Sequence, residues 1–133
     1  MSALPEPGAW KSAAVCHQEL FAALEPGARI GLVAREAPGT MLLWETRGAG
    51  IEVRSAPFPG FSASGVDILL SADAQALAAI RAADDAHLFA VLRAGIRSGA
   101  VICYMLSRRC VLEAQGFEEL LEALGFAFMG ACR

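Results

Sequence analysis

Apolar positions recur every three or four residues from Trp10 to Leu24, which is the spacing of one face of an α-helix. A Pro-Gly pair follows and is typical of a helix end. Two prolines and a glycine interrupt the first eight residues. We therefore expect a flexible arm over 1–8 and a helix over 9–24, at the start of a single domain over 9–133.

Apolar and polar residues then alternate in short runs, the pattern of half-buried strands. Glycine and proline turn signals separate the first three runs too closely for crossover connections, which predicts an antiparallel meander. We expect one antiparallel sheet with the helices over 9–24 and 72–82 packed on one face. The predicted strands are 29–35, 40–47, 50–55 and 66–70.

The segment 56–65 cannot form a central strand because Pro57 and Pro59 lack the amide donors of a ladder. Phe58 and Phe61 are unusual in such a loop. They either cap the core locally or form the lip of a pocket or interface.

The second half of the chain contains residues that are typical of helix starts and helix ends. Ser71 is the expected cap of the helix over 72–82, and Asp84 or Asp85 is the expected cap of a second short helix that Gly95 ends.

Residues 100–114 fit both a strand and a helical stripe, and a helix is favoured. A last helix from Phe117 to Leu124 is expected to end at Gly125.

Hydrophobic residues make up 56% of the 133 residues and charged residues 19%, against about 45–50% and 25% in ordinary globular chains. Much of the excess is alanine, which indicates either a compositional bias of the genome or a surface hidden against a partner or lipid. The net charge is −3, and the arginines form no phosphate-tracking surface with interleaved aromatic residues. Nucleic-acid binding is therefore not expected.

Four cysteines stand at positions 16, 103, 110 and 132, and none forms a C-x-x-C pair. This spacing disfavours structural zinc and redox chemistry, so no metal and no cofactor is expected. The N-terminus lacks the charged and apolar regions of a signal peptide, and no apolar run is long enough to span a membrane. The expected location is the cytoplasm, with reduced thiols.

Few residues are candidates for catalysis, and no catalytic residue is assigned. His17 lies on the apolar face of the first helix and is expected to be structural. His87 is either a proton-transfer group or part of a solvated helix start. Cys103 is expected to be a small core residue. Cys110 follows two arginines, so it is either a reactive thiolate or an ordinary thiol.

The stretch between Ser71 and Gly95 is rich in alanine, so its two helices would cover a sheet only loosely. Loosely filled layers either collapse or accept a guest, and small-molecule sites are mostly apolar and concave. Close packing of small residues is the alternative. The residues expected to line an apolar cavity are Leu77, Ile80, Leu88, Phe89, Leu92, Ile102 and Met105.

Over residues 10–112 the chain resembles the sterol carrier protein type-2 family. In that family a strand with an aspartate leads to a helix, and an apolar segment then joins two glycines. Asp67, the helix Asp73–Ile80, Leu92, Gly95 and Gly99 occupy the matching places.

The chain departs from the family at Ala100, where a polar residue commonly follows the second glycine, and over 115–133, which has no counterpart. The resemblance implies an α+β domain with helices over a mainly antiparallel sheet of four or five strands. It also implies an apolar tunnel for acyl chains or sterol-like lipids, and no catalytic residues.

Non-enzymatic binding of a hydrophobic small molecule is the first functional hypothesis. A module that forms homodimers through an apolar surface is the alternative, and a small enzyme that uses Cys110 or His87 is the third. The surface proposed for dimerisation contains Phe58, Phe61, Phe126, Phe128 and Met129.

Overall fold

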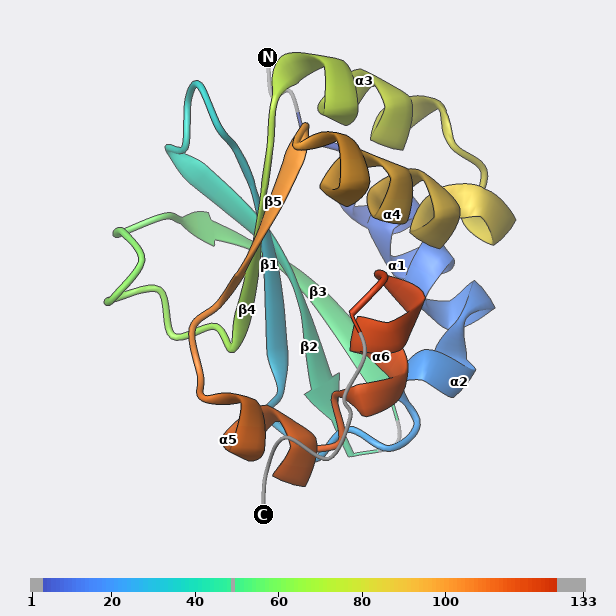
Figure 1. Cartoon of the computed structure of the whole chain (residues 1–133), viewed down its shortest axis with the longest axis vertical. Helices are drawn as coiled ribbons and strands as arrows, with labels where there is room; N and C mark the ends of the chain where they lie inside the picture. The colour runs from blue at the N-terminus through green and yellow to red at the C-terminus, as the bar shows by residue number, and fades with distance from the viewer. Residues whose placement is uncertain (1–3, 49, 127–133) are drawn as a thin grey trace.

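The structure is a computed structural model that describes residues 4–48 and 50–126. The predicted α+β class is confirmed by its strands and helices (Figure 1). In chain order, the elements are α1 (Pro7–Cys16), α2 (Gln18–Phe21), β1 (Arg29–Ala34), β2 (Thr40–Arg47), β3 (Gly50–Pro57), β4 (Ile68–Ala72), α3 (Ala74–Ala82), the 3-10 turn η1 (Asp85–His87), α4 (Leu88–Ser98), β5 (Val101–Met105), α5 (Arg109–Ala114) and α6 (Glu118–Ala123).

The five strands form one sheet in the order β3-β2-β1-β4-β5. The predicted meander is confirmed, because β1, β2 and β3 pair antiparallel with their chain neighbours. The sheet is mainly antiparallel, as predicted, but the strand expected over 66–70 was wrongly placed in the antiparallel order, since β4 pairs parallel to β1 and only then antiparallel to β5. After β3 the chain crosses to the free edge of β1 and enters β4 in the direction of β1.

Helices cover one face of the sheet, as predicted from the spacing of their apolar residues (Figure 1). The main core lies between the two layers and joins inward-facing strand residues to the apolar sides of α1, α3, α4 and α6. Its largest fully buried side chains are Trp10, Trp44, Phe117, Ile30, Leu32, Leu42, Ile68, Leu70, Leu77, Leu92 and Leu112.

The other face of the sheet carries a smaller cluster of buried residues, among them Val33, Leu43 and Leu69. Phe58, in the loop after β3, packs against this cluster and caps it locally. Phe61 is 46% exposed, and its ring contacts those of Phe58 and Tyr104 with centroid separations of 5.6 and 4.8 Å.

The predicted helix over 9–24 is two helices, α1 and α2, because the backbone leaves helical geometry at His17 (φ −114°, ψ 37°). The ring of His17 is partly buried, as expected of a structural histidine. Its Nε2 lies 2.9 Å from the carbonyl oxygen of Asp85, which accepts the hydrogen bond, and the ring meets Phe89 edge-on. These contacts tie the end of α1 to η1.

The start of α3 differs from the prediction by two residues. Ser71 is buried in β4 because β4 extends to Ala72, where it still pairs with β1. Asp73 is the cap instead, and its carboxylate accepts a hydrogen bond of 2.8 Å from the amide of Ala76. The predicted cap at Asp84 is confirmed, since its side chain accepts from the amide of His87 at the start of η1.

The predicted end of α4 at Gly95 was wrong, because the helix continues to Ser98. Gly99 ends it with a left-handed backbone (φ +87°). Gly95 serves close packing instead, since a Cβ there would lie 2.7 Å from Cγ2 of Val101 on β5.

The favoured helix over 100–114 was also wrong in its first half. Residues Val101–Met105 form β5 because β4 offers them a free edge, while Arg109–Ala114 are helical as α5. The last predicted helix is confirmed as α6, and Gly125 follows it with φ +101°. Among residues 4–48 and 50–126, no helix is long and apolar enough to cross a membrane.

Candidate ligand-binding site

A groove of about 670 Å³ runs between α3 and α4, and we call it the helix groove. Its walls are made largely of methyl groups and glycines, so the two helices leave space that larger side chains would fill. The alanine-rich stretch predicted an apolar cavity that holds a guest, and that role for the groove stays a prediction. The residues that line it are Asp73, Gln75, Ala76, Ala79, Ile80, Val91, Ala94, Gly95, Ser98, Gly99, Ala100 and Val101.

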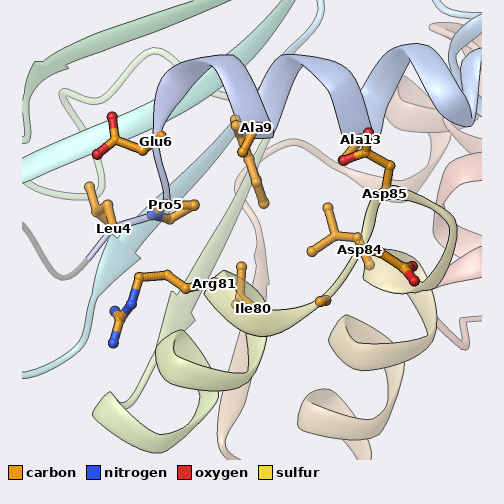
Figure 2. Close-up of a pocket in the computed structure, with 12 residues that line it drawn as sticks. Leu4, Pro5, Glu6, Ala9, Ala13, Ile80, Arg81, Asp84 and Asp85 are labelled. Atoms are coloured by element: carbon orange, nitrogen blue, oxygen red, sulfur yellow. The ribbon is translucent and has the colours of Figure 1, made fainter.

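A second hollow of about 210 Å³ lies between the start of α1 and the end of α3, and we call it the N-terminal pocket. Figure 2 shows α1 on one side and the chain from α3 into η1 on the other, with Ile80 near the centre. The charged ends of Glu6, Arg81 and Asp84 lie at the margins in this view. The full lining is Leu4, Pro5, Glu6, Ala9, Trp10, Ala13, Ile80, Arg81, Ala83, Asp84, Asp85 and Leu88.

Ile80 lines both the helix groove and the N-terminal pocket. Its side chain is 3% exposed and also belongs to the main core. Ile80 therefore lies between the two hollows, whereas a core residue that borders no hollow is enclosed by protein on every side.

Two of the seven predicted lining residues border these hollows, namely Ile80 and Leu88. Leu77, Phe89 and Leu92 are buried in the main core and line neither of them.

The two predicted lining residues on β5 lie on opposite faces of the sheet. Met105 packs against the main core, whereas Ile102 is 40% exposed and lies on the face that bears the smaller cluster.

Trp10 borders the N-terminal pocket but was not among the predicted site residues. Its ring stacks on that of Trp44 at a centroid separation of 4.0 Å, and its carbonyl oxygen accepts a 2.7 Å hydrogen bond from Trp44 Nε1. Trp10 Nε1 is itself buried and has no acceptor among the described residues. The sequence places Trp10 on an apolar helix face, but no spacing reveals that residues at the far end of α3 complete its surroundings.

Carboxylates predominate over cations at the N-terminal pocket. Glu6, Asp84 and Asp85 border it together with one guanidinium, that of Arg81. Asp84 Oδ1 lies 2.6 Å from His87 Nδ1, and this hydrogen bond lowers the pKa of the Asp84 carboxyl group. The Asp84 carboxylate is therefore charged at neutral pH.

No protein-family model matches the chain, and no curated protein matches it. A solved structure of a "UbiJ-SCP2 Ubiquinone synthesis protein" matches with a TM-score of 0.44 and 16% sequence identity. The match covers 82% of this chain and 74% of the other chain.

The residues considered for catalysis are dispersed. His87 is exposed and hydrogen-bonded to Asp84. Cys110 is bonded in a disulfide, so the expectation of a reduced thiol at this position was wrong. Burial raises the pKa of the Cys103 thiol from 9.0 to about 12, as expected of a core cysteine. Within the described part of the chain, no group of three His, Cys, Asp or Glu side chains is arranged to hold a metal ion.

A buried carboxylate on the other face of the sheet also escaped the sequence prediction. Glu45 is 2% exposed, and the guanidinium groups of Arg29, Arg47 and Arg54 surround it from three strands. The hydrogen bond from Arg29 is the main reason that the pKa of Glu45 is lowered, against the opposing effect of burial. These ion pairs join β1, β2 and β3, which is a structural role.

Proposed function

We propose that this protein binds a hydrophobic small molecule, an acyl chain or a sterol-like lipid, without catalysing a reaction on it. The ligand would lie in the helix groove. The observation that supports this most directly is the groove of about 670 Å³ between two alanine-rich helices. Such a volume falls within the range of about 300–1,000 Å³ that is common for small-molecule sites.

The apolar walls of the helix groove suit an elongated chain. Each methylene removed from water contributes about 0.8 kcal/mol, so ten methylenes would contribute roughly 8 kcal/mol. The loss of ligand freedom and the ordering of side chains offset part of that gain. Since about 8.2 kcal/mol corresponds to a Kd of 1 μM, burial of ten methylenes sets the micromolar range as an upper limit on the affinity before these costs are subtracted.

Alanines on α3 and α4 provide a test with matched controls. All four of Ala78, Ala79, Ala90 and Ala94 are exposed, but only Ala79 and Ala94 line the helix groove, and Ala78 and Ala90 line neither hollow. Alanine-to-leucine changes preserve helix propensity, so all four variants should fold. Ala79→Leu and Ala94→Leu should abolish uptake of a fluorescent fatty-acid or sterol analogue, while Ala78→Leu and Ala90→Leu should retain it.

Fluorescence titration measures the uptake, and urea unfolding checks that the four variants are equally stable. Wild-type protein that takes up neither analogue would refute the proposal. Equal uptake by all four variants would refute the helix groove as the site.

A second candidate function is homodimerisation. It is supported by an apolar surface beside β5, where Phe61, Ile102 and Leu106 are 46%, 40% and 36% exposed. β5 ends the sheet, and its strand residues contain no charge or proline of the kind that usually protects an exposed edge. Among the other residues predicted for the dimer surface, Phe126 is partly buried, and Phe128 and Met129 lie outside the described residues.

Light scattering during size-exclusion chromatography separates the two candidates. Ile102→Lys should convert a dimer to a monomer, whereas Val111→Lys, an equally exposed position on α5, should not. A wild-type protein that stays monomeric at all concentrations would exclude the dimer.

A further inference from the structure

The two edges of the sheet differ in how they are protected against pairing with another strand. β3 forms one edge and β5 forms the other. β3 carries Glu52, Arg54 and Pro57, and charged residues and prolines of this kind keep an edge from adding a further strand. β5 has the sequence Val-Ile-Cys-Tyr-Met and contains neither. Of the two edges, only that of β5 lacks this protection.

The pairing of β5 with β4 shows which backbone groups of β5 point away from the sheet. The carbonyl oxygen of Ala100 and the amide of Leu106, just before and just after β5, each form a hydrogen bond of 2.9 Å with a residue that flanks β4. In an antiparallel pair, residues that bond to the neighbouring strand alternate with residues whose N–H and C=O groups point outward. The outward residues of β5 are therefore Val101, Cys103 and Met105.

These outward groups are free to pair with a further strand. Among residues 4–48 and 50–126, none of them forms a backbone hydrogen bond with another segment. Beside them, the side chains of Phe61, Ile102 and Leu106 leave apolar surface exposed. A sheet edge with free backbone groups and an apolar border is a template for another strand.

The outward residues of β5 are evenly spaced about Cys103, so the strand is complementary to itself. A second β5 that runs antiparallel can place its Cys103 opposite the first, and Val101 of each copy then lies opposite Met105 of the other. On the exposed face, Ile102 of each copy lies opposite Tyr104 of the other. Like charges do not meet across this pairing, because every residue of β5 is uncharged.

We propose that two copies of this chain join edge to edge through β5, about a two-fold axis at Cys103, so that their sheets form one continuous sheet. The inference rests on the second candidate function, homodimerisation, and it specifies the segment and the register of the contact. A second copy fits this edge because an uncharged strand offers no charge to select another protein. The two-fold arrangement also pairs the free edge of both copies at once and is therefore closed.

Amide hydrogen exchange followed by nuclear magnetic resonance tests the pairing without any variant. The outward amides of Cys103 and Met105 are free in a monomer and hydrogen-bonded in the proposed dimer. Raising the protein concentration through the range in which light scattering detects dimerisation should slow their exchange about 10-fold or more. The amides of Ile51 and Val53 are the matched control, because they point outward from β3 at the protected edge. Their exchange should not depend on concentration.

Charged variants test the register. Ile102→Lys places a charge opposite Tyr104 of the other copy and should give a monomer. Ile102→Lys combined with Tyr104→Glu places opposite charges across the axis and should recover the dimer. Ile102→Lys combined with Tyr104→Lys changes the same two positions but brings like charges together, so it should stay monomeric. Urea unfolding checks that the two double variants are equally stable.

The outcomes separate this inference from the function on which it rests. A wild-type protein that stays monomeric at every concentration would show that homodimerisation is wrong, and this inference with it. If the protein dimerises but the amides of Cys103 and Met105 exchange at one rate in monomer and dimer, the copies meet through another surface and only the edge pairing is wrong. Equal oligomeric states of the two double variants would show that the register is wrong.

Discussion

Ile80 and Leu77 offer a test of whether the hollows beside α3 are accessible space. Both side chains are almost fully buried, at 3% and 1% exposure, and both lie on the inward side of the same helix. Replacing either by alanine removes three carbon atoms. At about 0.8 kcal/mol for each methylene, the loss of transfer free energy is roughly 2.4 kcal/mol for each variant.

The two variants should differ in what remains after the deletion. Leu77 lines neither hollow, so Leu77→Ala leaves a closed cavity and should cost about 3–5 kcal/mol in total. Ile80 separates the helix groove from the N-terminal pocket, so Ile80→Ala joins two spaces that solvent already enters. The cavity contribution should then be small, and the total cost should stay near 2–2.5 kcal/mol.

Urea unfolding followed by circular dichroism measures both free energies, and equal slopes of the two transitions are needed for a valid comparison. If Ile80→Ala is as destabilising as Leu77→Ala, then Ile80 is enclosed like any core residue and does not border accessible space. Uptake of the fluorescent analogue provides a second readout. Ile80→Ala should retain it or increase it.

Three further predictions concern the rest of the fold. The pKa of Glu45 is lowered in the folded state, so its contribution to stability is present above the ordinary pKa of 4.5 and is lost as the pH falls below that value. Glu45→Gln should therefore cost about 1–3 kcal/mol of unfolding free energy at pH 7. Urea unfolding at several pH values should show that the variant lacks this part of the acid dependence. Iodoacetamide at pH 8 should label the exposed Cys16 long before Cys103, whose thiol has a pKa of about 12, and mass spectrometry of the peptides would contradict this if both were labelled at one rate. Gly116→Ala should be severely destabilising in thermal unfolding, because Gly116 has φ +90° and an added Cβ would overlap the carbonyl group of Ala23; a wild-type melting temperature would show that the loop can relax.

Helices and strands could be predicted from the sequence where the local residue pattern alone determines them. Alternation identified β3, where Ile51 and Val53 pack against the main core, and the turn signals delimited β1 and β2, whose apolar side chains occupy both faces of the sheet. The apolar run at 101–105 was ambiguous because periodicity alone does not separate a short buried strand from a helix. This segment forms a strand because β4 has a free edge with which it pairs, and that contact between distant segments is not visible in the local sequence.

The candidate site was predictable in part for a similar reason. The alanine content of α3 and α4 predicted an apolar cavity; a groove lies between these helices, and the cavity itself stays a prediction. The depth of each side chain was not predictable, so Leu77 and Leu92 were expected at the ligand although they fill the core. Trp10 was missed because the pocket that it borders is completed by the end of α3, which is distant in the sequence.

The parallel pairing of β1 with β4, which we call the seam, affects the rate of folding. Residues 30–34 of β1 each pair with a residue that lies 38 positions later, from Ile30 with Ile68 to Ala34 with Ala72. The hairpins of the meander need only short loops to close, whereas the seam gains no contact until a long loop has closed. We therefore expect β1, β2 and β3 to assemble early and the attachment of β4 to limit the rate. Substitutions that weaken the seam should then slow refolding, whereas those in the far half of β3 should mainly speed unfolding.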